Sequence, residues 1–216
     1  MQKEYTWAVS PNNTPLLKKS CSHCDSKQFY CSEKFRINAQ KKNVDVWLIY
    51  RCVKCDSTYN LTIFSRTRPT AIDSILFNKF QNNDTELAWK YAFSEETRRK
   101  NKVEADLATV NYALQYNQIS SDELLSSNDR ILRFKVDYPF DFQLRISSLI
   151  RTCLNLSSRQ LDHLITQKAI TVAGKYLQKK HKAKDRDRIE IDCQKLKSIL
   201  CDKIQNILCN KIHNTQ

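Results

Sequence analysis

Residues 141–192 read DFQLRISSLIRTCLNLSSRQLDHLITQKAITVAGKYLQKKHKAKDRDRIEID, and this stretch decides the fold of the C-terminal part of the chain. It holds the only glycine of the protein, Gly174, between a short apolar run and a series of lysines. Glycine adopts positive φ angles at little cost. Because the chain contains so little glycine, we expect Gly174 to lie in a tight turn.

Two helices are predicted before this turn. Ser157 is a good N-cap for the second of them, over residues 158–168. Short strands are predicted over 170–172 and 175–177, on either side of the turn, and a last strand over 188–191. The apolar residues of the first helix recur at helical spacing and are Leu144, Ile146, Leu149, Ile150 and Leu154.

This order of elements resembles the alpha-L RNA-binding motif, the domain named after small-subunit ribosomal protein S-four. The motifs of that family correspond to Leu144-Arg145, Leu156-Ser157-Ser158-Arg159, Ile170-Thr171-Val172-Ala173-Gly174-Lys175 and Asp187-Arg188-Ile189-Glu190-Ile191. Two positions depart from the family pattern, since Ala173 stands in place of an asparagine and Arg186 in place of a glycine. The resemblance implies binding of structured RNA, with ribosomal or transfer RNA as the target by analogy.

The polar and basic side chains of this stretch are the candidate RNA contacts. The start of the second helix presents free backbone N–H groups to a phosphate, and the lysines after the turn can neutralise further phosphates. No aromatic cluster accompanies them, so we expect recognition of A-form shape and backbone. A solvated lysine face on a small α/β module is the alternative. The predicted nucleic-acid-binding residues are Ser157, Ser158, Arg159, Gln160, His163, Gln167, Lys168, Lys175, Lys179, Lys180 and Lys182.

Two CxxC pairs lie in the N-terminal part, Cys21-Ser22-His23-Cys24 and Cys52-Val53-Lys54-Cys55. Each short loop can place two thiolates on one tetrahedral metal ion, and two loops complete a four-cysteine shell. The β-like sequence between the pairs can form a hairpin that brings them together, and this arrangement resembles a zinc ribbon. The predicted ligands of one structural Zn²⁺ are Cys21, Cys24, Cys52 and Cys55.

Other interpretations of the cysteines remain open. Four buried thiols are one, and a redox CxxC pair is another, although no thioredoxin-like βαβ context surrounds either pair. Asp25 and Asp56 stand where zinc knuckles usually carry glycine. Cys31 and His23 are near enough to replace a ligand, but we favour a packed thiol and a loop side chain. The remaining cysteines, Cys153, Cys193, Cys201 and Cys209, are expected in the core.

The fold class predicted is α+β, in three sections: a zinc-ribbon-like β domain over 1–65, a helical then β connecting section over 66–140, and the alpha-L-like module with a final helix over 141–216. The tail has an apolar helical stripe from Leu196 to Ile212. In the first two sections, strands are predicted over 34–38, 44–50, 59–64 and 131–136. Helices are predicted over 69–80, 84–93 and 94–100. Residues 107–116 could form a strand or a helix.

Composition limits the location and the partners. The chain has 216 residues and a formal net charge of +13, which suits an anionic partner but also a surface that is merely rich in lysine. The start has no apolar signal segment, and no run reaches the roughly 18 apolar residues of a membrane span. We therefore expect a cytoplasmic protein without membrane contact, and its nine cysteines point to metal ligation or buried thiols.

Nearly all of the chain is also similar to a bacterial domain-of-unknown-function family, number 1062. The supporting residues are Tyr5-Thr6-Trp7, both CxxC pairs, Asp45-Val46-Trp47-Leu48-Ile49-Tyr50-Arg51-Cys52 and Trp89-Lys90-Tyr91-Ala92-Phe93. This resemblance implies no activity.

The function predicted is non-enzymatic binding of structured RNA, with no small-molecule substrate. A zinc-ribbon adaptor for protein or DNA is the first alternative. An RNA-modifying enzyme is the second, because alpha-L modules are often attached to such enzymes. Residues 66–140 are short for a catalytic domain, and a glycine-rich cofactor loop is impossible in a chain with one glycine.

Overall fold

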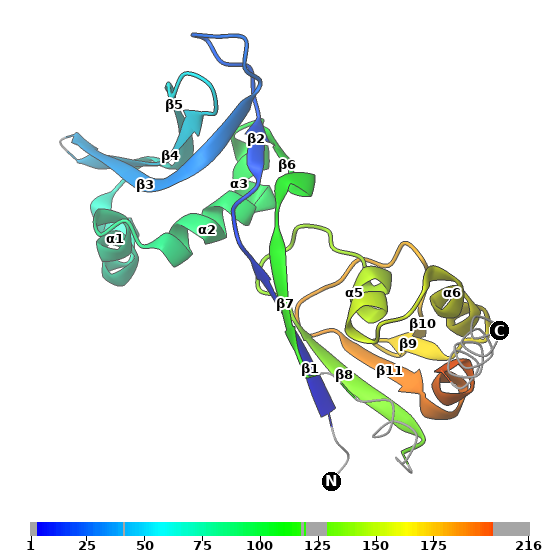
Figure 1. Cartoon of the computed structure of the whole chain (residues 1–216). Coiled ribbons are helices and arrows are strands. Elements are labelled where there is room, and N and C mark those ends of the chain that lie inside the picture. Colours follow the sequence, from blue (N-terminus) through cyan, green and yellow to red (C-terminus); the bar gives the residue numbers. More distant parts are fainter. Residues whose placement is uncertain (1–3, 41, 118, 120–128, 201–216) are drawn as a thin grey trace. The chain divides into compact units, whose positions relative to one another are not determined.

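The computed structural model describes residues 4–40, 42–117, 119 and 129–200. The chain forms two compact units. Pro11–Tyr112 form one, called here the cysteine unit, and Met1–Ser10 together with Ala113–Gln216 form the other, called the terminal unit. Each unit contains one β-sheet with helices beside it, so the α+β class is confirmed (Figure 1). The division differs from the three sections expected at 1–65, 66–140 and 141–216.

The cysteine unit has a five-stranded sheet in the order β5-β4-β3-β2-β6. The predicted hairpin is present, with Phe35 opposite Leu48, and its strands are longer than expected. A bulge at Cys31–Lys34 interrupts the pairing of its two strands. The strands are β2 (Leu16–Lys18), β3 (Gln28–Gln40), β4 (Asn43–Cys52), β5 (Thr58–Thr67) and β6 (Glu104–Asp106).

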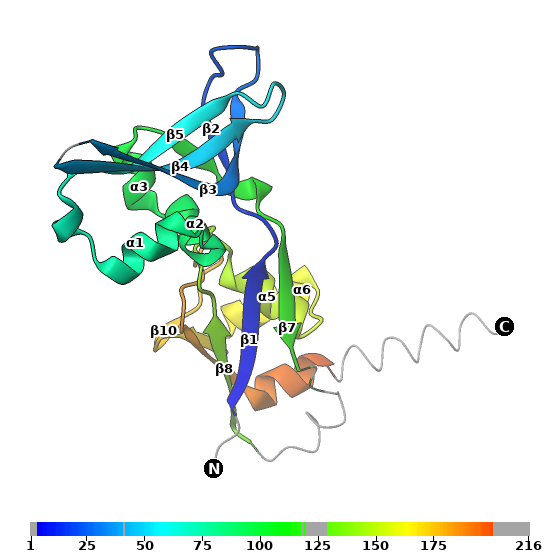
Figure 2. The same cartoon turned by 90° about the vertical axis from the view of Figure 1, so that its left-hand side faces the viewer.

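Three short helices follow β5 and pack against this sheet (Figure 2). They are α1 (Ser74–Gln81), α2 (Thr85–Phe93) and α3 (Glu95–Lys100), and the helix predicted over 69–80 begins later than expected, after a 3₁₀ turn η1 (Pro69–Ala71). Each helix starts at a side chain that accepts a backbone N–H. These caps are Asp73, Asp84 and Ser94.

The aromatic residues between these helices and the sheet build the core of the cysteine unit. Phe80 of α1 packs edge-on against Phe35 of β3, with ring centroids 4.9 Å apart. Leu17, Leu48 and Leu61 are fully buried in the same cluster. The helices therefore belong with the cysteine-bearing sheet and do not form a separate section.

The terminal unit has a six-stranded sheet in the order β10-β9-β11-β8-β1-β7. Its β1 (Glu4–Pro11) runs parallel to β8 (Ile131–Asp137), with Trp7 opposite Val136. Trp7 is 1% exposed and stacks on Phe134, at 4.3 Å between ring centroids. Because β1 joins a sheet whose other strands come from the C-terminal half, residues 4–10 belong to the terminal unit and not to the 1–65 section in which they were expected.

The segment 107–116, which suited either helix or strand, contains both. It forms a 3₁₀ turn η2 (Leu107–Thr109) and then β7 (Tyr112–Tyr116), which lies at the edge of the six-stranded sheet beside β1.

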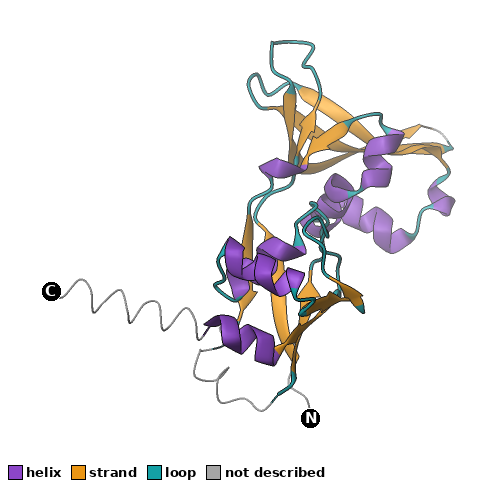
Figure 3. Cartoon of the chain, turned by 90° about the vertical axis from the view of Figure 1, so that its right-hand side faces the viewer, coloured by secondary structure: helices purple, strands orange, loops and turns teal. Residues whose placement is uncertain are grey.

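The predicted order of elements in residues 141–192 is confirmed. Helices α5 (Ile146–Cys153) and α6 (Ser158–Thr166) lie next to each other on one side of the sheet (Figure 3). The hairpin β9 (Ile170–Val172) and β10 (Lys175–Tyr176) follows, and β11 (Arg188–Asp192) pairs with both β9 and β8.

A helix follows β11 over residues 193–200. Cys153 and Cys193 are buried, as predicted. The rest of the predicted tail stripe, with Cys201 and Cys209, lies outside the described residues. Within the described ranges, no helix combines the length and the apolar composition needed to cross a bilayer.

Candidate metal centre and nucleic-acid interface

The four predicted metal ligands meet at one end of the five-stranded sheet. Their sulfur atoms all lie within 4.8 Å of one another. The Cys21–Cys55 and Cys24–Cys52 sulfur pairs are each 3.6 Å apart. A tetrahedron with metal–sulfur bonds of about 2.3 Å has sulfur–sulfur edges of about 3.8 Å. The four cysteines can therefore hold one metal ion.

The two CxxC loops share one backbone geometry. In each loop the N–H of the first cysteine donates to the carbonyl five residues ahead, from Cys21 to Ser26 and from Cys52 to Ser57, both at 2.9 Å. This hydrogen bond closes each loop around its pair of thiols. The loops meet because Cys21 and Cys24 lie between β2 and β3, while Cys52 ends the neighbouring β4 and Cys55 lies in the turn before β5.

Asp56 supports the second loop in the position where such loops often carry glycine. Its φ is 58°, and its N–H donates to the carbonyl of Cys52. Its carboxylate accepts from the Tyr30 hydroxyl at 2.7 Å and from the Arg51 guanidinium. These two donors lower the pKa of the Asp56 carboxyl. Asp tolerates the left-handed region better than most residues.

The thiols differ in acidity because each has different hydrogen-bond donors and a different degree of burial. The Ser57 hydroxyl and the His23 N–H lower the pKa of Cys21. Burial raises the pKa of Cys52, but N–H donors of Cys55 and Lys54 outweigh it and bring the pKa to about 6.

Cys24 has the opposite balance. The N–H of Ser26 lowers its pKa, but burial and the neighbouring sulfurs raise it to about 12. Four thiolates at this spacing repel one another, and a bound cation removes that repulsion. The donor set thus fits a metal ion that prefers thiolate sulfur.

The two possible substitute ligands lie outside the group. The His23 side chain is exposed, and Cys31 is 9% exposed in the core, where burial raises the pKa of its thiol to about 12. Neither side chain belongs to the group of four cysteines whose sulfur atoms converge.

Several of the predicted RNA contacts form hydrogen bonds within helix α6 and at its ends. The Ser157 hydroxyl accepts the N–H of Gln160, while the Gln160 side chain accepts the N–H of Ser157, which is a complete capping box. His163 and Gln167 are hydrogen bonded to each other across one turn of α6 at 2.8 Å. The Ser157 hydroxyl and the Gln160 side chain are therefore occupied by the helix itself.

The predicted basic residues are exposed. Lys168 lies over the ring of Tyr176 at 5.5 Å, and Lys179 is paired with Asp162 at 2.9 Å. Lys182 pairs across an isolated β-bridge with Arg145, so the lysine run lies beside the start of α5. The basic residues predicted to contact RNA that are exposed in this unit are Arg159, Lys168, Lys175, Lys179, Lys180 and Lys182.

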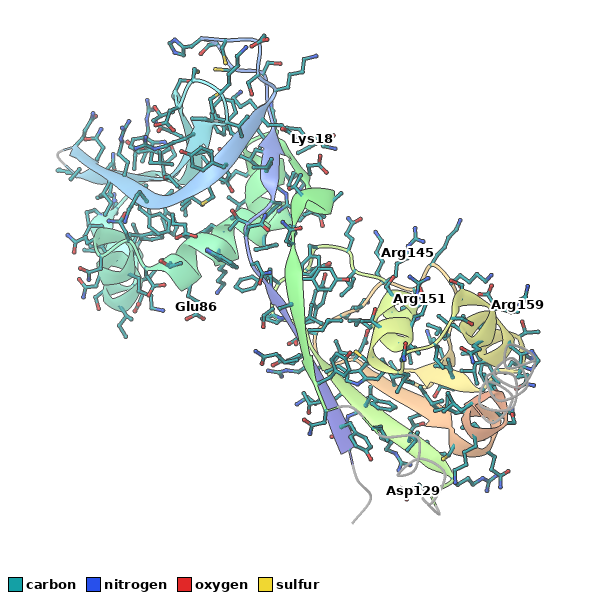
Figure 4. The ribbon with its side chains drawn as sticks, viewed as in Figure 1. Lys18, Glu86, Asp129, Arg145, Arg151 and Arg159 are labelled. Carbon is teal, nitrogen blue, oxygen red and sulfur yellow. The ribbon has the colours of Figure 1, made fainter. Side chains whose placement is uncertain are left out.

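A pocket of about 300 Å³ opens between α5 and α6. Arg145, the N-cap of α5, and Arg151, in its last turn, line it together with Lys179. Arg145 and Arg151 are labelled in Figure 4. Arg151 donates to the Ser158 hydroxyl at 2.8 Å, which joins the two helices. Ser147, Ser148, Ser158 and the Asp162 carboxylate complete the polar lining.

Arg145 and Arg151 are absent from the residues predicted to contact RNA. A signal for them exists, because Arg145, Ser148 and Arg151 recur every three residues. This polar stripe lies opposite the buried Ile146, Leu149, Ile150 and Cys153. Two guanidinium groups, one ammonium group and the hydroxyls of Ser148 and Ser158 can bind an oxyanion such as phosphate. The Ser147 hydroxyl donates to the carbonyl of Lys179 at 3.4 Å.

Comparison with known proteins identifies the family and nothing beyond it. No curated protein and no solved structure matches the chain. The family model described as "Protein of unknown function (DUF1062)" matches residues 37–176, which is more than half of the 216 residues. The match begins in β3, includes Cys52, Cys55, α5 and α6, and ends in β10. The chain therefore belongs to the DUF1062 family.

Proposed function

We propose that this protein is a non-enzymatic, cytoplasmic RNA-binding protein. Its terminal unit binds the backbone of structured RNA. Its cysteine unit binds one structural Zn²⁺ in a zinc-ribbon-like module. The observation that carries the proposal is the pocket between α5 and α6. Two arginines and a lysine converge there, next to a row of exposed lysines.

The chemistry of the pocket favours backbone phosphates over bases. Arginine binds phosphate oxygens through two parallel N–H donors, and serine hydroxyls add further donors. Asp162 lines the same pocket but is paired with Lys179, so it does not leave an isolated negative charge facing a phosphate. The order of elements in residues 141–192, which resembles the alpha-L motif, supports the same conclusion. Ribosomal and transfer RNA are the target classes that the resemblance favours.

The zinc assignment rests on the four converging sulfurs. Cytosolic four-cysteine sites with tetrahedral spacing commonly hold Zn²⁺, and a closed shell leaves no open position for catalysis. The role proposed for the ion is to fix the ends of β2, β3, β4 and β5.

An RNA-binding titration tests the first part of the proposal. The full-length protein is titrated at rising salt into a fluorescein-labelled RNA hairpin with a 16-base-pair stem. Replacing Arg145 and Arg151 together by Ala removes two phosphate contacts. The slope of log K against log salt should fall by about 1.8, and affinity should fall roughly tenfold.

The matched control replaces two exposed arginines of the cysteine unit, Arg36 and Arg68, by Ala. It removes the same charge but leaves the pocket intact, so affinity should stay close to that of the unmodified protein. Equal binding by the pocket variant and the control would rule out this pocket. Crosslinking in cells followed by RNA sequencing then names the target.

Metal analysis combined with alkylation tests the zinc assignment. Purified protein should contain about one zinc per chain. Treatment with a strong chelator should expose Cys21, Cys24, Cys52 and Cys55 to N-ethylmaleimide, as mapped by peptide mass. Cys52→Ser should lose the metal, whereas Cys31→Ala, a buried thiol in the same unit, should keep it. A folded protein without metal would contradict the assignment.

A further inference from the structure

The cysteine unit carries a second basic pocket, of about 680 Å³, beside the metal centre. Its lysines come from three places: Lys18 and Lys19 at the end of β2, Lys27 before β3, and Lys54 in the second CxxC loop. The side chain of Val53, which is 47% exposed, forms part of the wall. The remaining lining residues are Ser20, Asp25, Ser26, Gln28 and Asp106.

Backbone pairing sets the positions of these lysines. The N–H of Lys19 donates to the carbonyl of Lys27 at 3.0 Å, so the two lysines stand at the two ends of the first CxxC loop. Lys18 is opposite Gln28 in the β2–β3 ladder. The N–H of Val53 donates to the carbonyl of Gln28, which joins the second loop to the same wall.

The lysines give the pocket a positive charge, and its aspartates balance only part of that charge. Four lysines and two aspartates line it, a formal net charge of +2. Lys54 is already paired with Asp25, and Lys19 lies over the ring of Tyr59 at 4.7 Å. Among the described residues, Lys18 and Lys27 form no ion pair, and both are exposed (Lys18 is labelled in Figure 4).

We propose that this pocket is a second phosphate-binding site, which takes the phosphodiester backbone of RNA. The proposal rests on the RNA-binding function proposed above. Ammonium groups on flexible stems suit a polyanion whose phosphates repeat along a strand, because each lysine contributes a sequence-independent contact. The side chains of Ser20 and Gln28 can donate hydrogen bonds to phosphate oxygens, whereas the Ser26 hydroxyl donates to the carbonyl of Gln28.

A competing role for these lysines is to balance the metal centre. A Zn²⁺ ion with four thiolates carries a net charge of −2, and neighbouring lysines would stabilise it. The two roles predict different measurements, because a balancing role changes metal affinity and leaves RNA affinity unchanged.

The test uses zinc-loaded, full-length protein and the same labelled RNA hairpin. The double variant Lys18→Ala/Lys27→Ala should bind roughly tenfold more weakly at 0.15 M salt, with a salt slope lower by about 1.8. Lys18→Arg/Lys27→Arg keeps the charge and should restore binding. Lys34→Ala/Lys90→Ala is the matched control, since both residues are exposed lysines of the same unit that do not line the pocket, and it should bind like the unmodified protein.

The outcomes separate this site from the function on which it rests. Normal binding by Lys18→Ala/Lys27→Ala, with weakened binding by Arg145→Ala/Arg151→Ala, overturns this site and leaves the RNA-binding function standing. Zinc loss from the lysine variant, with unchanged RNA affinity once zinc is restored, assigns the lysines to the metal and also overturns the site. No binding by the unmodified protein defeats both proposals.

Discussion

At the scale of single residues, left-handed backbone is widespread although glycine is scarce. Gly174 has a φ of 77°, as its place in the predicted turn requires. Ten other described residues also have positive φ, including Ala173 at 47° and Arg186 at 64°. These are the two positions that depart from the alpha-L pattern. At Ala173 the pairing of β9 with β10 holds the turn, and at Arg186 the backbone N–H donates to the carbonyl of Val136.

The Ala173–Gly174 turn offers the sharpest prediction at this scale. Both central residues have positive φ, the φ pattern of a type I′ turn, in which asparagine is preferred at the first position. Ala173→Asn should raise the unfolding free energy of the terminal unit by about 1 kcal/mol, because Asn tolerates left-handed backbone better than Ala. Hydrogen exchange of the β9 amides measures the change.

The control for this variant is Ala113→Asn, at an exposed position of β7 in the same unit and without positive φ. It should leave stability within about 0.5 kcal/mol. Equal effects of the two substitutions would show that φ at position 173 is not the source of the gain.

At the scale of elements, local hydrogen-bond chemistry determines where helices begin. Asp84, Ser94 and Ser157 are residue types that favour the N-cap position, and each accepts an N–H from a residue three positions ahead. The helix predicted from residue 69 starts later because Asp73 offers such a cap and the residues before it do not.

The capping box of α6 supplies the prediction at this scale. Ser157→Ala leaves the N–H of Gln160 without its acceptor and releases the Gln160 side chain. It should lower the stability of the terminal unit by about 1 kcal/mol. Thermal melting followed by circular dichroism measures the effect, and Ser10→Ala, an exposed strand serine of the same unit, should leave the melting temperature nearly unchanged.

At the scale of the whole molecule, both ends of the chain build one unit. The ladder between β1 and β8 joins residues far apart in sequence. Trp7 of β1 packs on this pairing by stacking on Phe134 of β8. The cysteine unit is inserted between these strands in the sequence. A sheet completed in this way depends on its N-terminal strand.

Removing the side chain of Trp7 tests that dependence. Trp7→Ala should destabilise the terminal unit by about 3–5 kcal/mol, because it leaves a large cavity beside Phe134. The β8 amides should then exchange faster, while the cysteine unit should keep the zinc proposed for it. Tyr176→Ala, which removes an aromatic ring that is 57% exposed, should cost far less. Loss of metal from the Trp7 variant would contradict two units with separate cores.

Local sequence patterns were enough to predict which four cysteines converge, where α2, α3 and α6 begin, and the order of elements in residues 141–192. Each depends on neighbours within a few residues, through CxxC spacing, side-chain acceptors or apolar periodicity. Contacts in the folded chain establish where β1 pairs, which helices cover the cysteine-bearing sheet, and that the polar stripe of Arg145 and Arg151 shares a pocket with Lys179. These contacts join segments that are distant in sequence, and burial selects such partners without a local signal that names them.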